Sequence, residues 1–144
     1  MPSRSGPAAA VVIGRFPDQA RVLLRKDPEQ GFWTHFEGSG PGHRWEGVVQ
    51  AFTRATGLAV QRLYAADYLE QYFDTATGQV MVIPVFVVET NCHAPVADDS
   101  QVRWCTLEEA IERVPFPNQV LLYEHVWRFF VDQQPTGLLE IALS

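Results

Sequence analysis

The first third of the chain alternates between short apolar runs and turn-forming residues. The runs over residues 8–14 and 20–25 predict two β-strands, and the Pro and Asp within 16–19 favour a hairpin turn between them. Residues 27–31 are polar and contain a Pro and a Gly, which predicts a loop. Residues 32–36 then predict a short extended segment. The chain is therefore expected to begin with a small antiparallel unit.

The middle of the chain changes from this strand pattern to a helical one. Residues 37–43 contain three glycines and one proline, which predicts a loop with unusual backbone angles. Apolar residues then recur at helical spacing, and Gly57 is placed to end the helix in the left-handed conformation. The apolar stripe of this helix consists of Trp45, Val48, Val49, Phe52 and Ala55.

A long hairpin is predicted next. Residues 59–73 are rich in β-branched and aromatic side chains and predict one long strand or a broken pair of strands. A turn over 74–78 leads into a partner strand over 79–89, in which Pro84 indicates a sheet edge or a bulge. Residues 91–100 are expected to form a loop.

The last part of the chain predicts one more strand and two helices. Residues 101–105 predict a short strand, and the spacing of Thr106 and Glu109 predicts a capping box that opens a helix to about residue 114. A final helix is expected over 118–132. Strands mixed with helices in this order favour an α/β fold in which a mixed sheet is covered on both faces.

Length and composition restrict the function classes. The chain has 144 residues, of which 47% are hydrophobic, so we expect one domain over 8–132 with loosely held tails at 1–7 and 133–144. The formal net charge of −6 argues against binding to a nucleic-acid polymer. The N-terminal apolar run is too short to span a membrane. The two cysteines lack a CxxC spacing, which gives no support to a zinc or thioredoxin-like site. Because no segment resembles a secretion signal, we expect a cytoplasmic protein with reduced thiols.

Four segments are similar in order and spacing to those of the Nudix hydrolase family, and together they place the resemblance over residues 8–132. They are Arg21–Lys26, Phe32–Trp33, Thr56–Leu58 and Trp104–Ala110. The resemblance implies a Nudix-type α/β/α sandwich with a mixed sheet. It also implies a relation to Mg²⁺-dependent pyrophosphohydrolases of nucleoside-diphosphate-linked substrates.

The metal-binding box of that family departs from its pattern in this chain. The box reads G-x5-E-x7-R-E-U-x-E-E-x-G-U, where U is a bulky apolar residue. When its end is aligned on Gly57, the three glutamates of the R-E-U-x-E-E stretch fall on Ala51, Arg54 and Ala55. Mg²⁺ requires oxygen ligands, which alanine lacks, and a guanidinium repels a cation while it suits a phosphate or carboxylate. We therefore expect no metal site and no cofactor.

The resulting hypothesis is a Nudix-like protein that binds a nucleotide-like or other small anionic metabolite without ordinary Mg²⁺-dependent hydrolysis. Basic side chains could contact phosphate, and aromatic rings could stack on a base. Each of these side chains also has a purely structural interpretation. The basic side chains on strands could lie at exposed strand ends, and the arginine on the helix could be solvated. The aromatic side chains could pack in the core. The candidate ligand-binding residues are Arg25, Lys26, Trp33, His35, Arg54 and Tyr72.

Three alternatives stay open. An active pyrophosphohydrolase could hold Mg²⁺ through relocated acids, for which Glu37, Glu46 and Glu70 are the candidates. Each acid also has a structural interpretation. Glu37 could be solvated in a loop, Glu46 could complement the helix dipole from the first turn, and Glu70 could face solvent on a strand. A non-hydrolytic enzyme on the same fold could use His43 or Cys105. An interaction module could use the last helix as a partner face, for which a homodimer is one arrangement.

Overall fold

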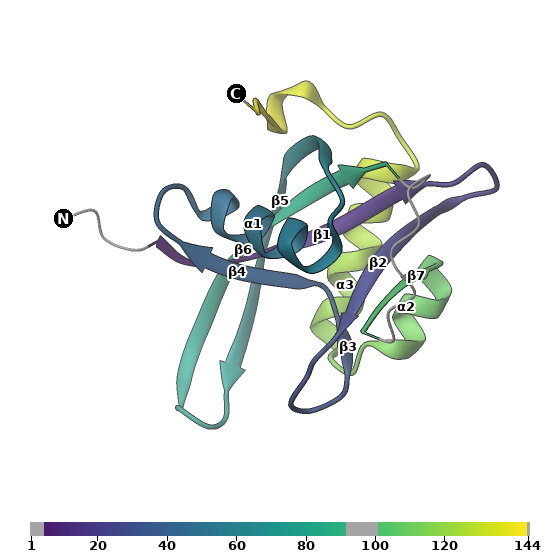
Figure 1. Cartoon of the computed structure of the whole chain (residues 1–144). Helices are drawn as coiled ribbons and strands as arrows, with labels where there is room; N and C mark the ends of the chain where they lie inside the picture. The colour runs from purple at the N-terminus through teal and green to yellow at the C-terminus, as the bar shows by residue number, and fades with distance from the viewer. Residues whose placement is uncertain (1–4, 92–100, 144) are drawn as a thin grey trace.

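A mixed β-sheet between two helical layers forms the core of the protein (Figure 1). The computed structural model describes residues 5–91 and 101–143. The strands are β1 (Ser5–Arg15), β2 (Ala20–Lys26), β3 (Trp33–Thr34), β4 (Phe36–Gly40), β5 (Val60–Asp74), β6 (Gln79–Thr90), β7 (Val102–Cys105) and β8 (Glu140–Ile141). The helices are α1 (Arg44–Thr56), α2 (Leu107–Arg113) and α3 (Pro117–Val126), followed by a π-helical turn η1 (Trp127–Val131) and a 3₁₀ turn η2 (Gly137–Leu139).

The sheet has the order β3-β2-β1-β6-β5-β8, with β4 paired to β1 and β7 paired to β2. The β1–β6 pair is parallel, and the other pairs are antiparallel. Strand β1 explains the two layers, because its alternate residues belong to different core clusters. Ala8, Ala10 and Val12 belong to the cluster on the α1 side, whereas Val11 and Ile13 belong to the cluster with α2 and α3. The α/β/α sandwich with a mixed sheet is confirmed.

Several local predictions are confirmed by hydrogen bonds. Gly57 ends α1 with a φ of 73°, and its backbone N–H donates to the Thr53 carbonyl. Thr106 and Glu109 form the expected capping box at the start of α2. Pro84 lies in β6 just before the pairing with β1 begins at Val85, so its missing N–H interrupts no bond to that strand.

Other boundaries differ from the expectations. The segment 37–43, expected to be a loop throughout, contributes β4, and the predicted single final helix changes to a π-helical turn after Val126. Residues 59–73 form one strand rather than a broken pair, with a register irregularity between Ala65 and Leu69. From residue 92 the predicted loop over 91–100 lies outside the described residues, as does Cys92.

The tails are more ordered than the sequence suggested. Strand β1 already begins at Ser5, within the expected N-terminal tail 1–7. In the expected tail 133–144, strand β8 pairs with β5, and Arg62 forms an ion pair of 3.8 Å with Glu140. The backbone of this segment thus pairs with a strand that is distant in the sequence. Among the described residues, no helix is long and apolar enough to cross a membrane.

Two glycines allow α1 to lie directly against β4. A Cβ atom on Gly38 would be 2.6 Å from the Gly47 carbonyl oxygen and 2.9 Å from the Ala51 Cβ. A Cβ atom on Gly47 would be 2.7 Å from the Ser39 carbonyl carbon. All three distances are shorter than a van der Waals contact, so this approach of helix to strand requires glycine on both sides. The approach fixes which face of α1 is turned toward β4.

We predict that Gly47→Ala lowers the free energy of unfolding by about 1–3 kcal/mol, because the added methyl group forces α1 away from β4. This loss should outweigh the gain of roughly 1 kcal/mol that alanine brings to a helix interior. Urea unfolding of both proteins measures the difference. Gly137→Ala is the control, since a Cβ atom there meets no atom within 4 Å. Equal stability of the two variants would contradict the close contact.

Candidate functional site

A cavity of about 480 Å³ lies along β4 and the adjoining face of α1. Glu37 and Ser39 are exposed on this wall, and Arg25 of β2 supplies the positive charge of the lining. Arg25 is paired with Asp27 at 3.9 Å, a long separation that leaves the guanidinium able to bind another anion. The lining residues are Pro7, Arg25, Phe36, Glu37, Gly38, Ser39, Ala51 and Ala55.

The helical wall of this cavity offers no metal ligand. Ala51 and Ala55 are one turn apart on α1, and both line the cavity with methyl groups. Arg54 is exposed and is not among the lining residues, which differs from the expectation that its guanidinium takes the place of a bound cation. These three positions do not fit a Mg²⁺ ion, because none supplies an oxygen ligand.

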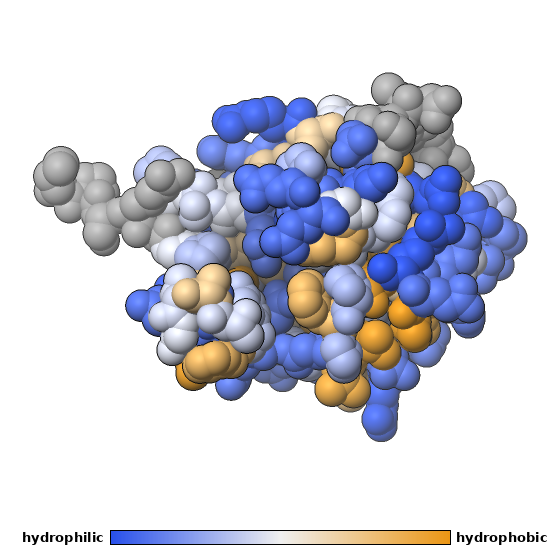
Figure 2. Space-filling view, turned by 90° about the horizontal axis from the view of Figure 1, so that it is seen from below, coloured by the Kyte–Doolittle hydropathy of each residue, from blue (hydrophilic) through white to orange (hydrophobic). Residues whose placement is uncertain are grey.

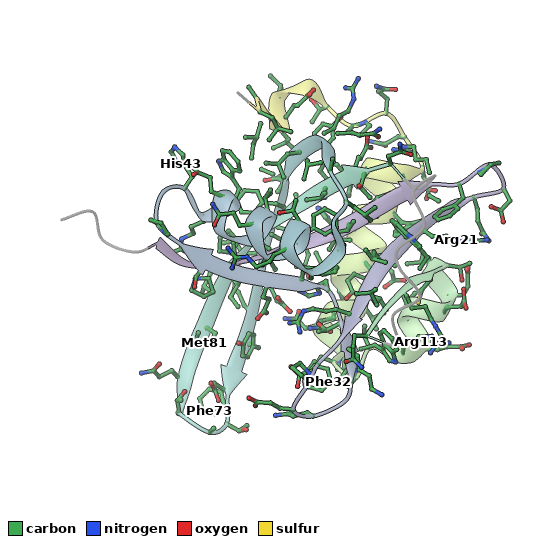
Figure 3. All side chains as sticks on the ribbon, in the orientation of Figure 1. Arg21, Phe32, His43, Phe73, Met81 and Arg113 are labelled. Atoms are coloured by element: carbon green, nitrogen blue, oxygen red, sulfur yellow. The ribbon has the colours of Figure 1, made fainter. Side chains whose placement is uncertain are left out.

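Glu46 has the structural role that its place in the sequence favoured. It lies in the first turn of α1, and its carboxylate accepts a 3.2 Å hydrogen bond from the backbone N–H of His43. An acidic side chain in the first turn also complements the helix dipole. His43 stacks on Trp45 at the N-terminal end of α1, away from the hairpin that bears Phe73 and Met81 (Figure 3).

A buried polar network lies next to the cavity and joins β5 and α3 to the segment around β3 and β4. The His35 ring is fully buried, with Nδ1 2.9 Å from the Tyr123 hydroxyl and Nε2 3.3 Å from Glu70 Oε2. Gln119 donates through Nε2 to Thr34 Oγ1 at 3.2 Å and to Glu70 Oε1 at 3.3 Å. Glu70 is therefore buried, and it does not have the solvent-facing strand position that was its structural interpretation in the sequence.

The protonation states in this network follow from burial and from partners. Burial raises the pKa of the Glu70 carboxyl, but the hydrogen bond and charge of His35 and the hydrogen bond from Gln119 outweigh it and lower the pKa overall. Burial, with the nearby Glu70 charge, raises the pKa of the Tyr123 hydroxyl far above its ordinary value. Tyr123 therefore keeps its proton at every physiological pH.

The Glu37 carboxylate lies near this network, on the cavity side. One carboxylate oxygen of Glu37, one of Glu70 and a ring nitrogen of His35 all lie within 4.8 Å of one another. Tyr72 is close by: burial raises the pKa of its hydroxyl, as do the charges of Glu37, Glu70 and Asp74. The structure thus brings together His35, Glu37 and Glu70, with Tyr72 beside them.

The remaining candidates lie apart from the cavity lining. Trp33 is half-buried and packs against the core, with the Arg103 guanidinium 5.8 Å from its ring centre. Lys26 is exposed at the end of β2. Burial raises the pKa of the Cys105 thiol, which disfavours the thiolate that a nucleophile requires. Tyr123 and Gln119 were missed by the sequence analysis, because each contacts residues at least 49 positions away.

The surface around the hairpin of β5 and β6 is mixed in character. Leu69, Phe73, Val80 and Val82 are exposed on the hairpin face opposite Glu70 and Tyr72. Seen from the end toward which the hairpin points, hydrophobic side chains form separate patches between polar ones (Figure 2).

Comparisons with known proteins give the fold but no sequence relative. No family model and no curated protein matches the chain. Solved structures do match it over 85% of its length, among them an Ap4A hydrolase of C. elegans with a TM-score of 0.69, 20% identity and 95% of that chain covered. The NUDIX domain of Shewanella oneidensis NrtR, complexed with ADP ribose, matches with a TM-score of 0.68, 16% identity and 85% of that chain covered.

A third match is the C-terminal domain of mouse MUTYH, solved in complex with human PCNA. Its TM-score is 0.62 at 20% identity, with 85% of the present chain and 88% of that domain covered. The chain therefore has the Nudix fold, as the four sequence segments indicated.

We predict that Tyr123→Phe lowers the free energy of unfolding by about 1–3 kcal/mol, because it leaves the buried Nδ1 of His35 without a partner. Thermal or urea unfolding in a chelator-containing buffer measures the change. Tyr72→Phe removes the same hydroxyl from a half-exposed ring and should alter stability by no more than about 0.5 kcal/mol. If the two variants lose the same stability, the hydrogen bond between Tyr123 and His35 does not stabilise the fold.

Proposed function

We propose that this protein binds a nucleotide-like anionic small molecule in the cavity along β4 and α1, without metal-dependent hydrolysis at the helix. The observation that supports this most directly is the composition of the cavity wall. Arg25 gives it one positive charge, with the Glu37 carboxylate on the same wall, whereas the helix side presents only the methyl groups of Ala51 and Ala55. Such a wall can accept a phosphate through the guanidinium. It has no acidic pair on the helix that would hold Mg²⁺.

The Nudix fold supports the chemical class of the ligand. The NrtR domain, which shares this fold, was solved with ADP ribose, a molecule in which a diphosphate links two sugar units. The cavity of about 480 Å³ falls within the volume range of ordinary small-molecule sites. ADP-ribose is therefore the first probe for the present chain, followed by other nucleoside-diphosphate-linked molecules.

Glu37 and Glu70 favour one second candidate function. If these carboxylates and His35 hold a divalent ion against a bound diphosphate, the protein is an active pyrophosphohydrolase that uses relocated acids. This function requires metal-dependent release of phosphate or a nucleoside monophosphate, and the loss of that release in Glu37→Gln. Glu46 has no part in it, because its carboxylate caps α1.

We predict that ADP-ribose or a related diphosphate raises the melting temperature of the protein equally in EDTA and in Mg²⁺. A ligand at 100 times its Kd stabilises a protein by about 2.7 kcal/mol, which is readily measured by scanning fluorimetry. Ligand recovered by chromatography should be intact. Mg²⁺-dependent cleavage would favour the second candidate, and the absence of binding across the whole panel would contradict both.

Arg25→Ala should weaken this binding by roughly tenfold or more, because a hydrogen bond to a charged group contributes about 1.5–3 kcal/mol. Calorimetric titration in EDTA gives the dissociation constant. Arg54→Ala is the matched control, since it removes the same charge from an exposed position outside the lining. If Arg54→Ala weakens binding as much as Arg25→Ala does, the ligand does not occupy this cavity.

A further inference from the structure

Three potential metal ligands converge on one point from two segments that are distant in the sequence. His35 lies between β3 and β4, Glu37 lies in β4, and Glu70 lies in β5. One ligand atom from each lies within 4.8 Å of the other two. His35 Nε2 and Glu70 Oε2 are 3.3 Å apart, which is close to the separation of roughly 3.4 Å between two ligands of a tetrahedral Zn²⁺ with bonds of about 2.1 Å.

The electrostatics of this group favour a cation at its centre. Glu70 is buried, and its described hydrogen bonds, from His35 and Gln119, are both 3.3 Å long. The Glu37 carboxylate adds a second negative charge nearby, and it forms no ion pair with any residue of 5–91 or 101–143. Two close carboxylates, one of them buried, are stabilised when a positive ion lies between them.

The buried network is also incompletely paired. Gln119 is 94% buried, and its Oε1 atom has no hydrogen-bond partner within the described part of the chain. The same amide group contacts Glu70 through Nε2. Buried polar groups are normally satisfied, so the unpaired oxygen of a side chain that itself donates to Glu70 indicates that the described side chains do not complete the network.

Tyr123 orients His35 in the manner of an outer-shell partner. Its hydroxyl lies 2.9 Å from Nδ1, on the opposite side of the ring from Glu70. When Nδ1–H donates to this hydroxyl, the lone pair of Nε2 points toward Glu70 Oε2, where a metal ion would be held. Metal-binding histidines commonly use the second ring nitrogen in this way.

We propose that His35, Glu37 and Glu70 form a binding site for a transition-metal dication. One imidazole and two carboxylates suit Zn²⁺, Mn²⁺ or Fe²⁺ better than Mg²⁺, which prefers oxygen ligands alone. No residue of α1 belongs to this site, so it is distinct from the box helix. Glu37 also lines the cavity, which places the ion at the cavity wall with coordination positions free for water or an anion.

Calorimetric titration of the chelator-treated full chain with Zn²⁺ alone tests the site. One ion per chain should bind to the wild type, and millimolar Mg²⁺ should not displace it. Co²⁺ should give a visible ligand-field spectrum that Zn²⁺ abolishes. Glu37→Gln changes an exposed side chain, so it should leave the fold intact while it weakens Zn²⁺ binding by at least about tenfold.

The control variants are Glu112→Gln and His43→Gln, which remove an exposed acid and an exposed imidazole outside the cluster and should bind Zn²⁺ as the wild type does. His35→Gln, checked for folding by circular dichroism, should abolish the Co²⁺ spectrum. Unchanged Zn²⁺ affinity in Glu37→Gln would overturn the proposal, as would binding that is lost only in Cys92→Ser. These titrations contain no anionic ligand, so their failure is distinguishable from a failure of the proposed function.

Discussion

The contact between α1 and β4 determines what the protein presents to its cavity. Gly38 and Gly47 meet where no side chain fits, so the helix lies directly on the strand. That contact turns Ala51 and Ala55 toward the space beside β4. A helix one side chain farther from the sheet would leave a wider and less defined cleft. The chemistry of the site thus follows from a packing constraint and from which residues occupy the helix face that the constraint selects.

The buried polar network next to the cavity is held in place by contacts between residues that are distant in the sequence. His35, Glu70, Gln119 and Tyr123 come from three segments and form one hydrogen-bonded group that is almost excluded from solvent. A polar network in such a low-dielectric setting is strongly directional, because a misplaced member loses its partner without gaining water. It therefore holds Glu70 and His35 in fixed positions next to the Glu37 carboxylate. The helix side of the cavity therefore carries only methyl groups, whereas the strand side carries the Glu37 carboxylate next to the buried ionisable side chains.

The sequence predicted the fold well because periodicity and capping are local signals. The apolar stripe from Trp45 to Ala55, the left-handed Gly57 and the Thr106 capping box each depend on neighbours within a few positions. The resemblance, aligned on Gly57, also predicted that Ala51, Arg54 and Ala55 stand where the family's box has glutamates. By contrast, β4 and β8 depend on pairing with distant strands, and the glycines of β4 and the shortness of β8 hide that pairing. Glu37 and Glu70 could be named as acids, but the proximity of Glu70 to His35 and Glu37 depends on two distant segments that meet only in the fold.

The proposed function requires that the cavity between Arg25 and the alanine face of α1 binds an anionic ligand without a metal ion on the helix. Amide chemical shifts of the ¹⁵N-labelled protein, followed by NMR during titration with ADP-ribose in EDTA and then with Mg²⁺ alone, test it most directly. The account predicts that ADP-ribose shifts the amides of Ser39, Ala51 and Ala55, and that Mg²⁺ leaves residues 50–56 unchanged. Saturable shifts of those helix amides with Mg²⁺ alone, or ADP-ribose shifts that appear only when Mg²⁺ is present, would contradict it.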